Sequence, residues 1–272
     1  MKRVLTGIVG VSLGLAAAFY LDGLWFFLGC ALVMIMAIRE FNRIGRQWAP
    51  AAPLGLLVIS VPVYGYALAW LPAVPEHRLF VTVLGLGLGL GMGAGLAVLL
   101  GRTPVSQSLS AAGLLVLGTL YFALPLAALV QLQRLSTWVL ALTLAVIWAG
   151  DVAALYIGRS FGRHKLAPVV SPNKSWEGAV AGLVAGLVVV AVWSWAILHR
   201  VDPALIAIGA ATAVAAQLGD LVESLYKRGA GIKDSGHLLP GHGGMYDRID
   251  ALLFGAPVML LGLLWIDFHA PF

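Results

Sequence analysis

The chain has 272 residues, of which 61% are hydrophobic and only 11% are charged. A soluble domain would carry about a quarter charged residues, so this composition excludes an ordinary water-soluble domain and indicates an integral membrane protein. The formal net charge of +5 would suggest nucleic acid as the partner of a soluble protein. Here the basic residues fall in short segments between apolar runs, so we expect membrane orientation and anionic lipid to explain them, and no nucleic-acid partner.

The long apolar runs predict the fold. A membrane-spanning helix needs about 20 mostly apolar residues, and irregular backbone is not tolerated against lipid. Each run is therefore expected to form one helix, which gives an all-α polytopic membrane protein with about nine transmembrane helices. The first run could also be a secretory signal peptide, but we expect a retained helix. The expected spans are, in chain order, 4–20, 24–38, 54–71, 79–100, 110–130, 135–158, 178–198, 203–222 and 251–268.

Glu40 follows the second span, close to Arg43. An exposed ion pair between these two side chains is the expected arrangement. In the fourth run, Gly87, Gly91 and Gly95 recur at every fourth residue and share one helix face. Small residues at this spacing let another helix approach closely. This face predicts tight helix packing and favours a homodimer.

The basic residues predict how the chain crosses the membrane. Loops on the cytosolic side are enriched in Lys and Arg. When loops are assigned to alternating sides, 14 of the 17 basic residues fall on the side of the N-terminus. We therefore predict a multi-pass protein of the inner (cytoplasmic) membrane with its N-terminus in the cytosol and its C-terminus outside. Two cytosolic loops, 159–177 and 223–250, are long and polar, so the active site is expected on the cytosolic side.

The segment 217–250 has the richest chemistry. Its first part is helical, and one face of that helix is predicted to carry Asp220, Glu223, Ser224 and Lys227, which recur at i, i+3, i+4 and i+7. Six glycines follow between residues 229 and 244. Because glycine readily adopts positive φ, such a loop allows backbone N–H groups to converge on an anion.

Asp247 and Asp250 stand three residues apart at the start of the last span, so both carboxylates can point the same way. Carboxylates aimed at one point suit a hard divalent cation, and Mg²⁺ commonly shares one or two carboxylates with substrate phosphates. The neighbouring basic residues would balance a triphosphate and the charge of its leaving group. These basic residues are Lys227, Arg228, Lys233 and Arg248.

The segment from Ser224 to Asp250 closely resembles the signature of the phosphatidate cytidylyltransferase family, also called CDP-diacylglycerol synthases. The shared pattern is S-x-x-K-R-x4-K-D-x-G-x3-P-G-H-G-G-x2-D-R-x-D. The resemblance implies transfer of a cytidylyl group from CTP to phosphatidate during phospholipid biosynthesis, giving CDP-diacylglycerol and pyrophosphate, with Mg²⁺ as the cofactor.

A second segment, Ser171–Gly178, is similar to the family element S-P-x-K-[ST]-x-E-G. It also fits an ordinary helix start with Ser175 as the cap. Asp151 lies inside the sixth span, where a carboxylate is a functional candidate by default. Relatives often have D-T-x-A-Y at this position, whereas this chain has Val152 and Leu155.

The resemblance leads to a hypothesis for the site, which we expect in a cleft between the sixth, eighth and ninth spans. The predicted ligands of the principal metal are Asp220 and Asp247. The predicted catalytic residues are Lys227, Arg228, Lys233, Asp234, Arg248 and Asp250, with Asp234 or Asp250 as a proton acceptor or the ligand of a second cation. The predicted substrate-binding residues are Asp151, Ser171, Asn173, Lys174, Ser224, His242, Gly243 and Gly244. Residues 1–130 are expected to be structural, dimer-forming or lipid-facing, and residues 131–272 to form the catalytic region.

Related chemistry remains an alternative. A cytidylyltransferase for an ether-linked isoprenoid lipid or a CTP-dependent polyprenol kinase would have similar headgroup chemistry. A secondary transporter would also combine buried charges with glycine-broken helices, but the first half of the chain holds no second copy of the 220–250 pattern. The motif of CDP-alcohol phosphotransferases, D-G-x2-A-R-x8-G-x3-D-x3-D, is missing.

Overall fold

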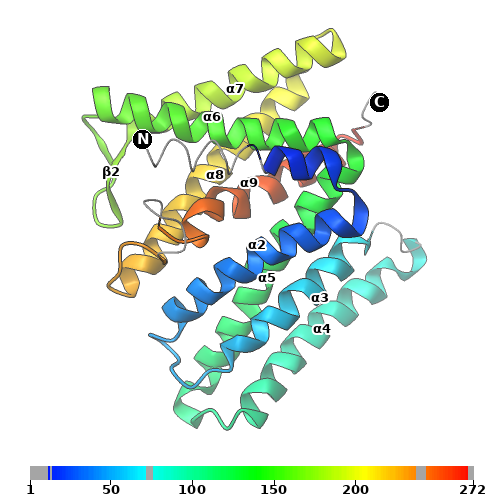
Figure 1. Ribbon diagram of the computed structural model, residues 1–272, viewed down its shortest axis with the longest axis vertical. Helices are drawn as coiled ribbons and strands as arrows, with labels where there is room; N and C mark the ends of the chain where they lie inside the picture. Colours follow the sequence, from blue (N-terminus) through cyan, green and yellow to red (C-terminus); the bar gives the residue numbers. More distant parts are fainter. Residues whose placement is uncertain (1–11, 13, 72–75, 237–242, 269–272) are drawn as a thin grey trace.

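The computed structural model describes residues 12, 14–71, 76–236 and 243–268, and it is an all-α polytopic fold with one small hairpin (Figure 1). Every expected span from 24–38 onward coincides with a helix. The first run reaches the described residues only near its end, where residues 14–20 are helical. The later helices are α2 Gly23–Gly45, α3 Leu57–Ala69, α4 Glu76–Leu100, α5 Ser108–Leu135, α6 Thr137–Phe161, α7 Trp176–Leu198, α8 Pro203–Gly229 and α9 Tyr246–Trp265.

Seven of these helices are long and apolar enough to cross a membrane. The exception is α3, whose 13 residues follow a short 3₁₀ turn at Leu54–Leu56. At about 1.5 Å per residue, α3 alone is too short for a bilayer of about 30 Å. The helix predicted for residues 54–71 is therefore confirmed, but α3 is shorter than a full membrane span.

The two polar loops are shorter than the sequence suggested. Helix α8 continues to Gly229 and α9 begins at Tyr246, so most charged residues of the predicted loop 223–250 lie on helices. The segment 223–229 stays helical because its residues include good helix formers and an i, i+4 ion pair between Glu223 and Lys227. The loop between α6 and α7 folds into an antiparallel hairpin of β1 Lys165–Ala167 and β2 Ser171–Ser175.

The helices form three groups (Figure 1). Helices α6 and α7 lie side by side, α8 and α9 pair beneath them, and α2 to α5 form the remaining group. Close approach of α6 and α7 depends on Gly178, where a Cβ would lie 2.7 Å from the carbonyl oxygen of Ala154. Helix α5 is the most enclosed span and packs against α9, which joins the N-terminal helices to the C-terminal ones.

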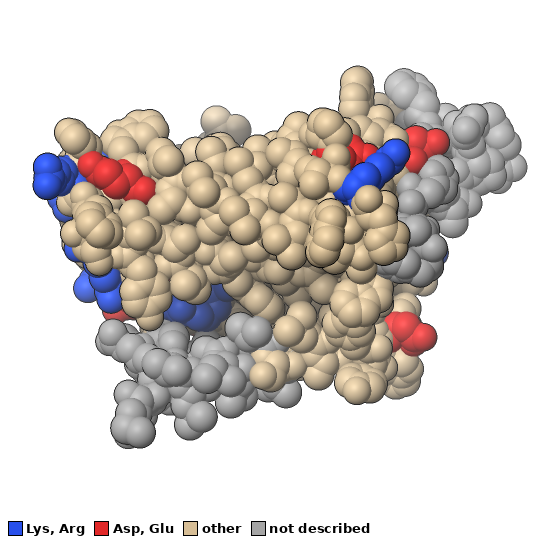
Figure 2. All heavy atoms as spheres, turned by 90° about the horizontal axis from the view of Figure 1, so that it is seen from above, with Lys and Arg blue, Asp and Glu red and all other residues tan. Residues whose placement is uncertain are grey.

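Hydrogen bonds join neighbouring segments at each of the two ends of the helices. At one end, the Ala51 N–H donates to Gln107 Oε1 at 3.3 Å, and Arg228 Nε donates to the Val170 carbonyl at 3.3 Å. At the other end, Gln133 donates to the Ala18 carbonyl at 3.1 Å. A wide band without charged side chains separates charged clusters at the two ends of the face in Figure 2. This arrangement agrees with loops that alternate between the two sides of a membrane.

The glycine face of α4 is open. A Cβ at Gly87, Gly91 or Gly95 would have nothing within 4 Å among the described residues. The 18-residue apolar window of this helix is only 17% buried. The close helix approach predicted for these three glycines is therefore not made by the described part of this chain.

Candidate functional site

Three carboxylates converge where α8 and α9 meet. Asp220 and Glu223 on α8 and Asp250 on α9 each offer an oxygen within 4.8 Å of the others. The two helices approach this closely because Gly219 has no side chain: a Cβ there would lie 2.5 Å from the Asp250 carbonyl oxygen. Carboxylates so close repel one another unless protons or a cation neutralise them. This carboxylate trio (Asp220, Glu223 and Asp250) is therefore a candidate cation site.

Glu223 is the most enclosed member of the carboxylate trio. Its side chain is 1% exposed, and neither of its oxygens has a directed hydrogen-bond partner among the described residues. The Lys227 ammonium, 2.6 Å from Glu223 Oε2, supplies positive charge. Burial of a carboxylate with so few hydrogen bonds is costly, and a bound cation would relieve that cost. Sequence reasoning placed Glu223 on the ionic helix face but did not assign it to the site.

Lys227 connects the carboxylate trio to Asp247. Its Nζ donates to Asp247 Oδ1 at 2.7 Å, and Asp247 Oδ2 accepts backbone N–H bonds from Ser235 at 3.1 Å and Gly244 at 2.8 Å. Gly243, with φ of 76°, provides the positive-φ turn that precedes Gly244. The sequence predicted that N–H groups of the glycine loop would converge on an anion. In the structure, that anion is a carboxylate of the chain itself.

The hairpin between α6 and α7 brings a second ammonium group to the carboxylate trio. Lys174 on β2 forms a 2.7 Å ion pair with Asp220. Ser175 caps α7 by accepting the Gly178 N–H at 3.1 Å, so the helix start expected there is confirmed. Asp151 on α6 interacts electrostatically with Asp220 and Lys174. Side chains from α6, β2, α8 and α9 thus share one electrostatic environment.

The other predicted residues that the structure describes bind backbone, are exposed or are half-buried. Arg228 binds backbone, since its guanidinium donates to the carbonyl oxygens of Val170 at 3.3 Å and Ile232 at 3.5 Å. Arg248 is exposed and interacts electrostatically with Asp151. His242 lies outside the described residues. Three predicted residues are exposed, namely Asn173 on β2 and Lys233 and Asp234 after α8, and two are half-buried, namely Ser171 and Ser224.

The prediction for Glu40 was wrong. Among the described residues its side chain forms no ion pair with Arg43. The residue is only 6% exposed and accepts hydrogen bonds from Ser235, Met245 and Tyr246. The physical reason is that α9 and the preceding loop pack over the end of α2 and present several donors to this carboxylate. Local sequence contains no signal for this contact, because the partners are about 200 positions away along the chain.

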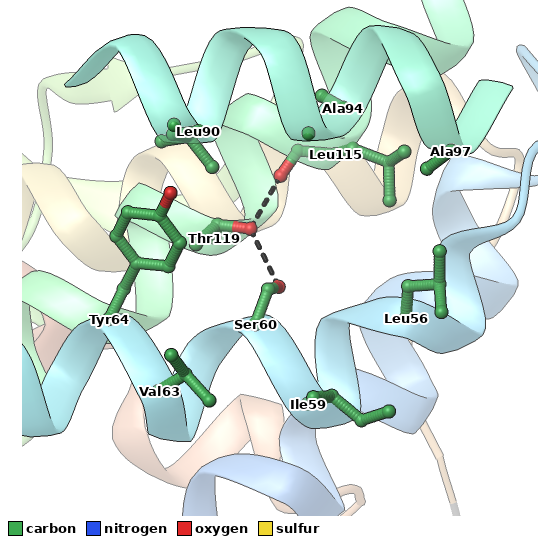
Figure 3. Close-up of a pocket in the computed structure, with 12 residues that line it drawn as sticks. Leu56, Ile59, Ser60, Val63, Tyr64, Leu90, Ala94, Ala97, Leu115 and Thr119 are labelled. Carbon is green, nitrogen blue, oxygen red and sulfur yellow. Dashed lines mark hydrogen bonds between the residues drawn. The ribbon is translucent and has the colours of Figure 1, made fainter. Parts of the chain in front are cut away.

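An apolar pocket lies apart from these charges, between α3, α4 and α5 (Figure 3). Its volume is about 240 Å³. The polar groups visible in it are Tyr64 and the hydroxyls of Ser60 and Thr119, which are hydrogen-bonded at 2.8 Å. Thr119 also donates to the Leu115 carbonyl at 2.8 Å. None of the lining residues of this pocket is charged, so the pocket offers no carboxylate or ammonium group to a cation or a phosphate.

The fold and the site define a multi-pass membrane protein with a cation-competent acidic centre, flanked by lysines, at one end of its spanning helices. Comparison with known proteins identifies the group within this class. The chain belongs to the cytidylyltransferase family, whose model matches residues 1–265.

Two relatives match over nearly the whole chain and a third over three quarters of it. A protein of Pseudomonas aeruginosa named phosphatidate cytidylyltransferase is 34% identical over 97% of this chain and 96% of its own length. A protein of the same name from Haemophilus influenzae is 32% identical over 94% of this chain and 96% of its own length. The Bacillus subtilis protein of that name is 32% identical over 75% of this chain and 79% of its own. The family expected from the 224–250 motif is therefore confirmed.

Proposed function

We propose that this protein transfers the cytidylyl group of CTP to phosphatidate and releases CDP-diacylglycerol and pyrophosphate. The two relatives that match nearly its whole length bear the name of this activity. The observation that carries the proposal is the carboxylate trio. Glu223 is buried and has no directed hydrogen-bond partner in the part of the chain that the structure describes, and Lys174 and Lys227 lie beside the trio. Such a centre suits a nucleotide triphosphate that arrives with a divalent cation.

The trio fits Mg²⁺ in both ligand type and charge. All its donors are carboxylate oxygens, which Mg²⁺ prefers. The trio and Asp247 provide four carboxylates and face two ammonium groups, so one divalent cation balances the remaining charge. Asp247 was a predicted ligand and shares Lys227 with Glu223, so it remains in the proposed ligand set. A bound Mg²⁺ would neutralise phosphate charge and polarise the α-phosphate.

The protein's own residues would hold and align the two phosphates. Lys174 and Lys227 each pair with a carboxylate at 2.7 Å and can exchange it for a phosphate oxygen. Arg248 and Lys233 are exposed, and we expect their side chains to contact the pyrophosphate portion. Arg228, which binds two carbonyl oxygens, would hold the hairpin against α8.

The reaction needs alignment more than a strong base. A phosphate oxygen of phosphatidate already carries negative charge, so it forms its bond to the α-phosphorus as the bond from that phosphorus to the bridging oxygen of pyrophosphate breaks. Bringing the two anions together in line supplies much of the rate enhancement. Asp234 or Asp250 would accept a residual proton or bind a second cation. Asp151, Ser171, Asn173, Ser224, His242, Gly243 and Gly244 complete the proposed substrate site.

The lipid would reach this centre from the bilayer. The carboxylate trio lies on spanning helices near the end that carries most of the basic residues. By the enrichment of Lys and Arg on the inner side, this end faces the cytosol, and the protein resides in the inner membrane. Phosphatidate would enter sideways between α6, α8 and α9 while its acyl chains stay in the hydrocarbon.

Radiolabelled CTP tests the proposal directly. The purified full chain in phosphatidate-containing micelles with Mg²⁺ is expected to transfer label from α-labelled CTP to lipid and none from γ-labelled CTP. Transfer of the γ-label alone would mean a lipid kinase and would overturn the proposal. Absence of labelled lipid from either nucleotide would also overturn it. Competition between phosphatidate and an ether-linked isoprenoid analogue separates the two cytidylyltransferase reactions, and the proposal requires phosphatidate to be preferred.

We also propose a homodimer. The open glycine face of α4 at Gly87, Gly91 and Gly95 offers room for a helix of a second copy. Gly91→Leu would fill this space, so the mass of the detergent-solubilised particle, measured by light scattering, is expected to fall by half. An unchanged dimer mass would show that another surface forms the contact, and a monomeric parent protein would exclude the dimer.

A further inference from the structure

Glu40 joins helix α2 to the segment that carries Asp247. Its Oε2 accepts the Ser235 hydroxyl at 2.6 Å and the Tyr246 N–H at 2.9 Å, and its Oε1 accepts the Met245 N–H at 3.0 Å. Glu40 is 6% exposed and Ser235 is fully buried. Three donors offset the cost of removing this carboxylate from water. The contact therefore has the strength to hold two distant parts of the chain together.

The donors belong to two segments. Ser235 lies within the glycine loop, and Met245 and Tyr246 follow it at the start of α9. The first N–H groups of a helix have no partner within the helix, and Met245, the N-cap residue of α9, makes no side-chain cap hydrogen bond. Glu40 accepts from this end of α9 and also places negative charge at the positive end of the helix dipole. It thus acts as a cap supplied by a different helix.

The Glu40 carboxylate is packed tightly against two residues that have no side chain, Gly236 and Gly244. A Cβ at Gly236 would lie 2.5 Å from Glu40 Oε1, and one at Gly244 would collide with Glu40 Oε2 and Ser235 Oγ. Both glycines therefore let the backbone close over the carboxylate. Any shift of Glu40 would displace the two segments that it binds.

The same two segments bind Asp247. Ser235 donates its hydroxyl to Glu40 and its N–H to Asp247 at 3.1 Å, and the Gly244 N–H donates to Asp247 at 2.8 Å. Asp247 in turn accepts from Lys227, whose ammonium lies 2.6 Å from Glu223. A continuous series of contacts thus connects Glu40 to the carboxylate trio, although Glu40 is no member of it.

We propose that Glu40 is a positioning residue for the active site: by fixing Ser235 and the first turn of α9, it sets where Asp247 and Asp250 stand relative to α8. This inference rests on the proposed function, because it assigns those carboxylates to the binding of a cation and CTP. Glu40 contacts neither substrate and acts through the loop and α9.

The test compares Glu40→Gln with the parent protein as full-length chains in detergent. Glutamine keeps the shape of the side chain but replaces one carboxylate oxygen by an NH₂ group. That NH₂ group then faces an N–H donor that the oxygen had accepted, so one hydrogen bond is lost. Loss of a hydrogen bond to a charged group predicts a fall in kcat of about tenfold or more and a rise in the half-saturating Mg²⁺ concentration. The stabilisation of the protein by Mg²⁺ in thermal unfolding is expected to shrink as well.

Two further variants separate positioning from stability. Gln133→Leu removes another buried polar side chain, which donates to the Ala18 carbonyl at the opposite end of the helices. It is expected to lower the melting temperature without changing kcat or the Mg²⁺ dependence. Ser235→Ala removes only one of the three bonds to Glu40 and is expected to move kcat in the same direction by less. Combined with Glu40→Gln, Ser235→Ala is expected to have little further effect, because the two side chains act as a unit.

The outcomes are distinguishable. If Glu40→Gln melts at a lower temperature but keeps the parent's kcat and Mg²⁺ dependence, as Gln133→Leu is expected to, the positioning role is refuted. If Glu40→Gln does not fold, Ser235→Ala decides by the same readouts. If the parent protein makes no CDP-lipid, the proposed function fails. Comparison of Mg²⁺-dependent melting in parent and Glu40→Gln proteins then still tests the link from Glu40 to the carboxylate trio.

Discussion

Replacement of Glu223 by glutamine is the sharpest test of the carboxylate trio, because it changes the charge and almost nothing else. The side chain keeps its volume, and Lys227 retains its 2.7 Å bond to Asp247. Glu223 is buried, so solvent cannot compensate for the lost charge. The trio, Asp247 and two lysines carry a formal charge that one divalent cation balances, and Glu223→Gln leaves this group one negative charge short.

The expected magnitude follows from the loss of one charged contact. Such contacts contribute about 1.5–3 kcal/mol, and each 1.4 kcal/mol is a factor of ten in an equilibrium constant. The Mg²⁺ concentration for half-maximal activity should therefore rise by about 10- to 100-fold. Activity at saturating Mg²⁺ should fall by a smaller factor, because the remaining carboxylates still bind the cation.

The assay is CDP-lipid formation by the purified full chain at fixed CTP and phosphatidate, with Mg²⁺ titrated. Asp202→Asn is the matched control. Asp202 lies at the opposite end of the helices, where it caps α8 by accepting the Ala204 N–H at 2.9 Å, and asparagine also caps helices well. It should titrate like the parent protein. A Glu223→Gln enzyme with the parent's Mg²⁺ dependence would refute the assignment of Glu223 to the cation site.

Two further variants probe the site, and a third probes a buried contact at the opposite end of the helices. Asp247→Ala removes the acceptor of Lys227 and of two loop N–H groups, so CDP-lipid formation should be lost while membrane extraction and gel-filtration behaviour stay normal; full activity would remove Asp247 from the site. Gly219→Ala places a Cβ 2.5 Å from the Asp250 carbonyl oxygen, so overpacking of about 1–3 kcal/mol should lower both the melting temperature in detergent and the activity. Ser194→Ala removes bonds to the backbone of 200–202, and this should reduce stability by about 1–3 kcal/mol while kcat below the transition stays that of the parent.

Much of the fold could be predicted from the sequence. In lipid, backbone groups must bond within their own segment, so apolar runs determine helices without knowledge of tertiary contacts. The periodicity of α8 also predicted correctly that Asp220, Glu223 and Lys227 share a face, and the motif between Ser224 and Asp250 identified the family. Helix ends were harder to predict. The spans were expected to end at residue 222 and to begin again at 251, whereas α8 continues as one helix to Gly229 and α9 already begins at Tyr246.

The sequence by itself determined that this protein lies in a membrane, where its helices are, and which charged residues gather at one end of them. These properties depend on composition and on contacts between residues a few positions apart. Only the tertiary structure decided which charges meet. The crossing of α8 and α9 at Gly219 groups Asp250 with Asp220 and Glu223, while Lys227 and the loop N–H groups occupy Asp247. Glu40 bonds to Ser235, 195 positions away, and no local periodicity encodes a contact that forms only when separate helices pack.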